Sequence, residues 1–316
     1  MYKNCPKCHV ELPEIAKFCF NCGENVELAG LQVCSGCRSS NPVGSPRCYG
    51  CGREMGEIAK FSLDFNLRYP LRLDMQDAIS EDFKAYFFKL LRQVVESELK
   101  PKLYGEYVET FYRSGFERMY RRRESLWEDD VCGWYDREGV SSLRKIDERT
   151  AAELSYLIDY FVVSHGGKLN EAKYPPAMLQ YHDARLGDAD FAQMALDYLA
   201  FEDERLVVFT NLLGMSSERL GNAKQHFLWL APDEQLTFVA DLSTFGSSFK
   251  DGFAMTNHSI YWKCFDRPQH VFFHQLADIR REKSHITING KFFNAGVSIN
   301  LKLLKLLKKI KTLFVI

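Results

Sequence analysis

Four CxxC pairs within the first 51 residues constrain this chain more than any other feature. They use eight of its ten cysteines and form two halves with one layout: a CxxC, ten intervening residues, a second CxxC and a glycine, Gly23 or Gly52. Four thiolates per half match the closed tetrahedral Cys₄ sites that hold structural Zn²⁺. The sequence therefore predicts two structural zinc ions, bound by Cys5, Cys8, Cys19, Cys22, Cys34, Cys37, Cys48 and Cys51.

Two other uses of paired cysteines have to be weighed against zinc. Disulfides need an oxidising compartment, and the sequence begins MYKNCPKC without an apolar signal segment. A redox CxxC normally opens a helix in a βαβ unit, and no such pattern surrounds these pairs. Structural zinc is the favoured interpretation. We therefore expect a cytoplasmic protein with reduced thiols. Peripheral contact with a membrane is an alternative that stays open.

The two halves resemble a known family. The segments CPKCHVELPEIAKFCFNCG and CSGCRSSNPVGSPRCYGCG are similar to the double zinc ribbon of many bacterial and archaeal proteins. His9 and Arg38 stand where that family usually has glycine after the first knuckle. With four cysteines present, His9 is interpreted as a surface residue rather than a ligand. The resemblance implies a module that docks onto proteins or nucleic acids.

The remaining length is enough for further domains, since the chain has 316 residues, 46% of them hydrophobic, and a net charge of −1. The balanced charge disfavours a protein whose main task is to grip nucleic acid. We predict an α+β multidomain protein: a double zinc ribbon at 1–55, a linker or edge strand at 56–75, a helical bundle at 76–230 and a small β-barrel with a C-terminal amphipathic helix at 231–316. The isolated Cys132 and Cys264 are expected to be buried small hydrophobes.

The segment FSLDFNLRYPLRLDM, residues 61–75, alternates apolar and polar residues. Period two predicts a strand with one buried face, and Pro70 places that strand at an edge or splits it. The segment has no local partner. We therefore expect it to pair with strands from the far end of the chain or to wrap the helical part.

The middle of the chain has apolar residues at helical spacing. Ser80 is predicted to cap the first helix, and Thr150 with Glu153 forms a capping box for a later one. Asp188 or Asp190 is predicted to cap a further helix. About five amphipathic helices of this kind predict a bundle.

The last part of the chain changes period again. Turn residues such as Asn257-His258 and Asn289-Gly290 separate short β-type runs. After Gly296 the pattern becomes helical, with lysines outside the apolar arc. Short strands followed by one amphipathic helix predict a small barrel plugged by that helix; the runs are 236–239, 252–256, 260–264, 271–273 and 285–288.

A second resemblance falls on these strands. The sequences KDGFAMTNHSIYWK, HVFFHQLADI and ITINGKFF look like the bacterial pleckstrin-homology-like domains. This resemblance implies a module that binds lipids, peptides or partner proteins and has no catalytic set. The matching residues are Gly252, Thr256, Ile260, Tyr261, Asp278 and Ile279.

Two basic clusters are candidate contacts for nucleic acid or lipid headgroups, because arginine and lysine suit phosphate. Acidic neighbours such as Glu117 and Glu124 favour local ion pairing for the first cluster. The second lies on the terminal helix, which we expect to plug the barrel, although a basic amphipathic helix can also lie on an anionic membrane. The clusters are Arg113, Arg118, Arg121, Arg122 and Arg123, and Lys302, Lys305 and Lys309.

The sequence contains no GxxxxGK[ST], HExxH or GxSxG, nor a GxGxxG that follows a strand. We therefore predict a non-enzymatic, zinc-binding adaptor or sensor that recognises a protein partner or a membrane surface, an architecture that would suit a bacterial stress or antiphage system. The alternative is a nucleic-acid-binding regulator that uses the zinc ribbons and the arginine-rich helix.

Overall fold

The computed structural model describes residues 2–4, 11–13, 31–33, 40–42, 76–187, 189–243, 247–264 and 267–314. The chain divides into two compact units, Met1–Glu96 with Lys100–Gly166, and Ser97–Leu99 with Gly167–Ile316. The second unit begins at Gly167, whereas the sequence predicts a boundary at residue 231. The strand predicted at 61–75 lies outside the described residues.

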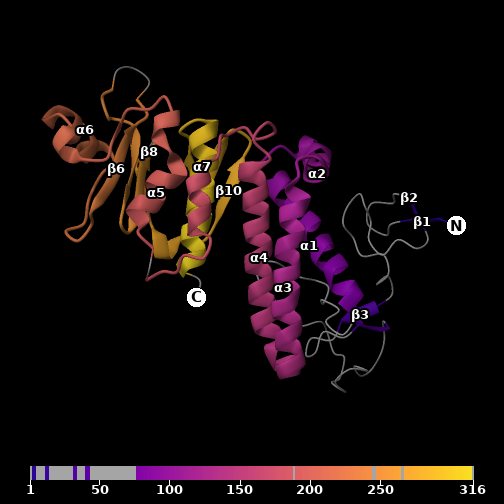
Figure 1. The fold of residues 1–316 in the computed structure, drawn as a ribbon. Coiled ribbons are helices and arrows are strands. Elements are labelled where there is room, and N and C mark those ends of the chain that lie inside the picture. Colours follow the sequence, from indigo (N-terminus) through magenta and orange to yellow (C-terminus); the bar gives the residue numbers. More distant parts are fainter. Residues whose placement is uncertain are drawn as a thin grey trace. The chain divides into compact units, whose positions relative to one another are not determined.

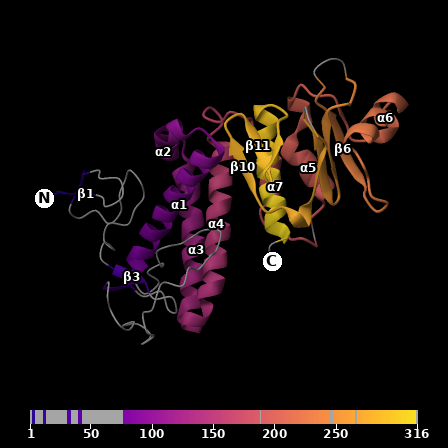
Figure 2. The same cartoon turned by 180° about the vertical axis from the view of Figure 1, so that it is seen from behind.

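Helices make up the described part of the first unit beyond residue 75. The long helices α1 (Gln76–Glu98, whose last residues are grouped with the second unit), α3 (Phe116–Glu138) and α4 (Leu143–Ser164) run alongside one another (Figures 1 and 2). The shorter α2 (Tyr104–Arg113) and two 3₁₀ turns, η1 (Pro101–Leu103) and η2 (Gly139–Ser142), connect them. The predicted helical bundle is confirmed for this region.

Aromatic rings fill the core of this bundle. Phe87 packs on Phe111 with ring centroids 5.2 Å apart, and Phe116 packs on Phe161 at 4.8 Å. The fully buried Trp127 stacks on a phenylalanine of α1 at 4.1 Å. Rings at these separations add favourable edge-to-face and offset contacts to the burial of apolar area.

Both helix starts predicted in this region are wrong. Ser80 lies inside α1, where its hydroxyl donates to Glu128 at 3.0 Å. Thr150 lies in the middle of α4, accepts the indole N–H of Trp127 at 3.0 Å and donates to the Ile146 carbonyl at 2.7 Å. A buried indole needs an acceptor, and the threonine that resembles a cap in sequence supplies one.

The second unit contains two antiparallel sheets. The larger has the strand order β5 (Val208–Phe209), β6 (Leu236–Asp241), β7 (Gly252–Thr256), β8 (Ser259–Lys263) and β9 (Gln269–Phe272). The smaller has the order β10 (Ile279–Glu282), β11 (His285–Ile288) and β12 (Lys291–Phe293). The predicted turns at Asn257-His258 and Asn289-Gly290 are confirmed, and the second has positive φ at both residues, 50° and 75°.

The prediction of a closed barrel is wrong, because within the described residues no strand pairing joins the two sheets. The 3₁₀ turn η6 (Phe273–Gln275) separates β9 from β10. Side chains connect the sheets instead: the ring of Phe293 lies 5.3 Å from that of Phe253, and the Trp262 indole donates to the Phe292 carbonyl at 2.7 Å.

Three helices complete the described second unit. The terminal helix α7 (Val297–Phe314) packs against α5 (Phe191–Leu199), β10 and β11, and Figures 1 and 2 show α5 and α7 side by side. Asp190 caps α5 by accepting from Ala192 and Gln193, as one of the two predicted caps. The unit also contains 3₁₀ turns at η3 (Pro176–Tyr181), η4 (Phe201–Asp203) and η5 (Leu212–Gly214).

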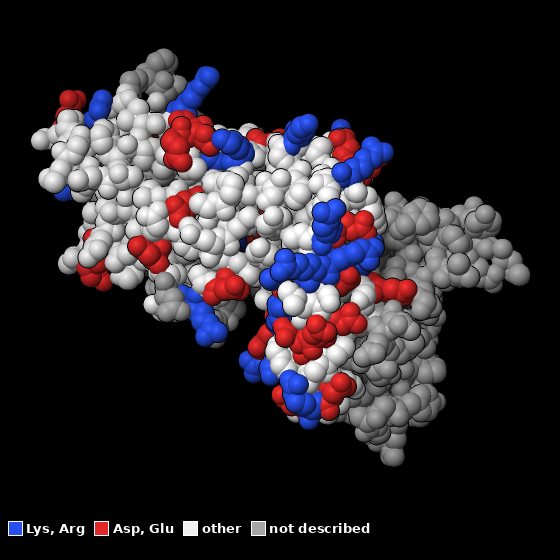
Figure 3. All heavy atoms as spheres, viewed as in Figure 1, with Lys and Arg blue, Asp and Glu red and all other residues white. Residues whose placement is uncertain are grey.

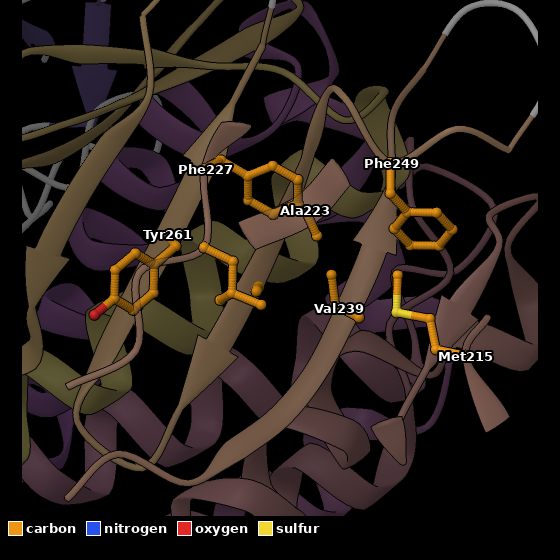
Figure 4. Close-up of a cluster of buried hydrophobic side chains, with 8 residues drawn as sticks. Met215, Ala223, Phe227, Val239, Phe249 and Tyr261 are labelled. Carbon is orange, nitrogen blue, oxygen red and sulfur yellow. The ribbon is translucent and has the colours of Figure 1, made fainter. Parts of the chain in front are cut away.

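The helix α6 (Ser217–His226) covers one face of the large sheet. Ala223 and Phe227 pack there with Val239 and Tyr261 in one hydrophobic cluster (Figure 4). Position 252, next to the Phe227 ring, requires glycine. A Cβ there would lie 2.4 Å from the Ala240 carbonyl oxygen and 2.7 Å from the Phe227 ring. The central strands of the sheet are therefore buried on both faces.

Candidate metal-binding and basic sites

Two short hairpins bracket the first CxxC pair of each half of the cysteine-rich region. In the first half, β1 (Tyr2–Asn4) pairs antiparallel with β2 (Glu11–Pro13), and Asn4 is opposite Glu11. In the second half, β3 (Leu31–Val33) pairs with β4 (Ser40–Pro42), and Val33 is opposite Ser40. Asn4 and Val33 each directly precede the first cysteine of their half. The two halves therefore repeat in backbone pairing as well as in sequence.

The eight predicted ligands, the cysteines of the four CxxC pairs, lie outside the described residues. Their chemistry fits zinc, because each half supplies four thiols and Zn²⁺ favours four sulfur ligands in structural sites. Within the described ranges no group of three or more His, Cys, Asp or Glu is placed to hold a metal ion. The cysteine-rich region is thus the candidate metal centre.

Comparison with known proteins supports this assignment. Residues 5–52 match the family model of the double zinc ribbon, a span that contains all four CxxC pairs. The N-terminal part of the chain is thereby supported as a double zinc ribbon, a type of domain that binds zinc. No curated protein and no solved structure matched the chain.

Three of the five predicted arginine contacts form ion pairs with acidic side chains. Arg113 lies 3.3 Å from Glu109, and Arg121 lies 2.9 Å from Glu117, both at the i,i+4 spacing of a helix surface. Arg123 binds both carboxylate oxygens of Glu153, at 2.5 and 2.7 Å. Local pairing thus describes Arg113 and Arg121, whereas Arg123 pairs with a carboxylate 30 positions away on α4.

Glu153 is the centre of a network that the sequence does not reveal. Its side chain is fully buried and also accepts from Arg149 at 2.5 Å, which in turn pairs with Asp130 at 3.1 Å. The guanidinium of Arg123 lies over the ring of Tyr156, 4.8 Å from its centroid. A buried carboxylate requires such partners, because charge without compensation is costly inside a protein.

Arg118 and Arg122 differ from the other three. Both are exposed, they lie one turn apart on α3, and neither forms an ion pair with any residue that the structure describes. Among the described residues, they are the members of the predicted cluster whose charge has no ion-pair partner.

The lysines of α7 lie in a different environment from the one predicted. Lys302 is 1% exposed; its ammonium lies 2.9 Å from Glu204 and donates to the Leu199 carbonyl at 2.9 Å. Lys305 is 8% exposed and lies 3.0 Å from Glu98. The sequence places these lysines outside the apolar arc, but distant carboxylates bring them into the core and neutralise them.

Two further lysines of this helix are also engaged. Lys308 lies 2.7 Å from Glu98, and Lys309 donates to the His182 carbonyl at 2.7 Å. Burial alone would raise the pKa of Glu98, but the charges of Lys305 and Lys308 outweigh it and lower this pKa to about 2. The carboxylate is therefore ionised at neutral pH.

Among the described helices, none combines the length and apolarity needed to span a bilayer.

A polar cluster on the α6 face of the large sheet gives a structural role to Thr256 and Tyr261, two residues that carry the pleckstrin-homology-like resemblance. The Tyr261 hydroxyl donates to Glu234 at 2.5 Å, and the Thr256 hydroxyl donates to the same carboxylate at 3.0 Å. The Thr256 oxygen also accepts the Ser259 N–H at 2.9 Å, which holds the β7–β8 turn. Burial and the neighbouring Glu234 raise the pKa of Tyr261 well above its usual value. No sequence pattern indicates Glu234, because its partners are more than twenty positions away.

Proposed function

We propose that this chain is a non-enzymatic adaptor or sensor, stabilised by two structural zinc ions, that recognises a protein partner in a reducing, cytoplasmic compartment. The observation that carries the proposal is the double zinc ribbon match over residues 5–52. A closed Cys₄ site leaves no coordination position for a substrate, so such a site shapes a surface instead of performing a reaction.

The second unit supplies a second binding module in this proposal. The resemblance to the pleckstrin-homology-like domains goes with a small barrel and a C-terminal helix; the described part of this unit has the terminal helix and two antiparallel sheets that are not closed into a barrel. Gly252 admits the ring of Phe227, and Thr256 holds the following turn. These residues have defined structural roles at the positions of the resemblance, and we take them as support for a binding module in this unit.

A protein partner is favoured over a membrane because of the way α7 uses its charges. Binding of a basic helix to an anionic surface requires exposed cations. Lys302 and Lys305 are buried and paired with Glu204 and Glu98. Lipid contact through α7 would first require these ion pairs to be broken.

Metal analysis tests the basis of the proposal. Wild-type protein prepared in reducing buffer is expected to contain two zinc ions per chain, and Cys34→Ser is expected to lose one of them. Cys132→Ser is the matched control, because Cys132 lies on α3, far from the CxxC pairs in sequence and outside their pattern, and its replacement should leave the zinc content unchanged. Wild-type protein without zinc, or equal zinc in Cys34→Ser, would refute the metal assignment.

The adaptor role is tested by capture of partners under native conditions. Crosslinking and mass spectrometry of the tagged full chain are expected to recover a protein that Cys34→Ser loses and Cys132→Ser retains. This difference ties the interaction to an intact ribbon, whereas simple adhesion would be equal in all three samples. A partner set that does not depend on the ribbon would count against the proposal.

A second candidate function, nucleic-acid binding, is favoured by one observation: the exposed Arg118 and Arg122 lie one turn apart on α3. It predicts an affinity that falls steeply with salt and that the double variant Arg118→Glu, Arg122→Glu abolishes. Gel shifts at low salt with duplex and single-stranded probes measure this. The absence of a shift with either probe would remove the candidate.

A further inference from the structure

The side-chain amide of Asn289 is a reactive group that carries no charge, unlike the interleaved basic and acidic side chains that Figure 3 shows on the long helices. Asn289-Gly290 is the single Asn-Gly pair in the sequence. Asparagine is a chemically labile residue. Since glycine has no Cβ, little shields its backbone nitrogen from the Cγ of the asparagine before it, and such pairs lose their amide more readily than other asparagines.

The β11–β12 turn needs this reactive pair. Ile288 is paired with Lys291, so two residues connect the strands, and both have positive φ, 50° and 75°. Asn-Gly is a preferred sequence for a two-residue turn of this kind. The turn that closes the smaller sheet therefore also introduces a position that can be modified.

The fold holds the Asn289 amide from both of its ends. Its Oδ1 accepts the N–H of Ala277 at 2.9 Å and that of Asp278 at 3.1 Å, and its Nδ2 donates to the Gln275 carbonyl at 2.8 Å. The Asn289 N–H also donates to the Asp278 carbonyl at 2.7 Å. These bonds tie the turn to the segment 275–278, which connects η6 to β10.

Loss of the amide consumes one water and releases one ammonia, without oxidation or reduction. The Gly290 nitrogen gives its proton to hydroxide and attacks the Asn289 Cγ. The N–Cγ bond forms, the Cγ–Nδ2 bond breaks, and ammonia leaves with a proton taken from water. Water then adds to either carbonyl of the succinimide ring and opens it, which yields aspartate or isoaspartate. Because Cγ has to turn toward the Gly290 nitrogen, the side chain must first give up its three hydrogen bonds.

We propose that Asn289 is a deamidation site that the contacts with segment 275–278 keep closed, and that it reacts when the turn separates from this segment. Native proteins open locally in this way without unfolding as a whole. An aspartate would keep the acceptor oxygen but could not donate to the Gln275 carbonyl, so oxygen would face oxygen. Isoaspartate adds a methylene to the main chain of the turn. Deamidation therefore marks, irreversibly, chains in which the turn has opened.

Peptide mapping by mass spectrometry tests the proposal on the full chain, incubated in mildly alkaline reducing buffer made with H₂¹⁸O. In guanidinium, Asn289 is expected to deamidate faster than the other asparagines, and its product should carry one heavy oxygen from water. In the folded chain its rate is expected to be at least about tenfold lower, because the reaction follows the population of the open form and three hydrogen bonds must open first.

A variant at position 277 shows whether these contacts give the protection. Ala277→Pro removes an N–H that Asn289 accepts, and Leu276 already has the extended backbone that precedes proline, with φ −66° and ψ 107°. The folded variant is expected to deamidate several times faster than wild type. Ala277→Ser keeps the N–H at this exposed position and is the matched control. Circular dichroism under the same conditions establishes that each variant is folded.

Asn289→Asp imitates one product and is expected to lower the guanidinium midpoint of unfolding. Asn294→Asp is its control, because the Asn294 Oδ1 accepts from the Gly296 N–H at 3.1 Å and from Asn300 at 2.9 Å, and a carboxylate preserves both bonds.

Three results would overturn the proposal. Equal rates at Asn289 in folded and unfolded wild type would show that the fold gives no protection, and this comparison depends on no variant. A folded Ala277→Pro that reacts at the wild-type rate would show that segment 275–278 does not hold the amide. An Asn289→Asp chain as stable as wild type would show that the modified turn closes again.

Discussion

The helices α3 and α7 both interleave basic and apolar residues, yet they use their charges in opposite ways. On α3, Arg121 pairs with Glu117 one turn away, and the arginine side chain remains 66% exposed. On α7, Lys302 has a fully buried side chain and its carboxylate partner, Glu204, lies nearly a hundred positions away. A basic residue in an amphipathic pattern therefore does not reveal whether its charge is offered to a ligand or used to hold the core.

The two arrangements also differ in what they contribute to stability. Exposed ion pairs contribute little, because water and salt screen them. A buried pair is costly to break, because the remaining charge stays in a medium of low polarity. The comparison can be tested by removing one partner at a time, and the effects should decrease from α7 to α3.

The largest effect is expected for Glu204→Gln. Lys302 would then keep a buried ammonium whose acceptors, the Leu199 carbonyl and the amide oxygen of the new glutamine, are both neutral. The free energy of unfolding should fall by about 3–5 kcal/mol. Urea unfolding followed by tryptophan fluorescence measures this change.

The double variant Glu204→Gln, Lys302→Met is the control for this experiment. With both charges removed, most of the stability should return, because no buried charge remains. If the double variant is as unstable as Glu204→Gln alone, then packing rather than charge dominates at this position.

The next effect concerns the pH dependence from Glu98. Its pKa is about 2 in the folded chain, compared with an ordinary value of 4.5. A lowered folded pKa means that the stabilisation is present above pH 4.5 and is lost as the pH falls toward 2. Its size is on the order of 3 kcal/mol.

Comparison of wild type with Glu98→Gln isolates this contribution. Wild type should be more stable at neutral pH, and the difference should shrink as the pH is lowered from 4.5 toward 2. Other titrating groups, including the cysteine thiols, are common to both proteins and cancel in the difference. A constant difference over this range would show that Lys305 and Lys308 do not stabilise the carboxylate.

A smaller effect is expected for Arg123→Ala. As in the ion pairs of α7, one partner of the Arg123–Glu153 pair is fully buried. Glu153 is buried but keeps Arg149 after the change. The loss should be about 1–3 kcal/mol, the cost of charge-assisted hydrogen bonds to a buried group. Arg123→Lys should restore only part of it, because an ammonium does not match both carboxylate oxygens. Full restoration would mean that charge alone, without the fork of the guanidinium, satisfies Glu153.

The same contrast explains which features could be predicted from the sequence. Patterns read within one turn were reliable for the Asp190 cap and for the Asn289-Gly290 turn, because their partners are close in the chain. Ser80 and Thr150 have the residue types of caps, but tertiary partners on α3 decide their roles. No local pattern indicates such distant partners.

The candidate sites show the same difference between local sequence patterns and partners that are distant in the chain. The spacing of the cysteines is itself the signal for zinc, so the sequence alone predicts eight ligands; these cysteines lie outside the described residues, and metal analysis tests that prediction. The burial of Lys302 depends on Glu204, and the role of Glu153 depends on α3. Pairs of this kind become visible only when the fold brings their elements together.

The smallest effect is expected for the surface of α2 and α3. Arg113→Ala and Arg121→Ala each remove an exposed i,i+4 pair and should lower the free energy of unfolding by only about 0.2–0.5 kcal/mol, less at high salt. Arg118→Ala and Arg122→Ala should change it even less, since neither arginine has an ion-pair partner among the described residues. Parallel urea titrations at low and high salt measure all four. A loss above about 2 kcal/mol for Arg118 or Arg122 would show that their charges stabilise the fold; unchanged stability with weakened binding of an anionic ligand would instead assign those charges to recognition.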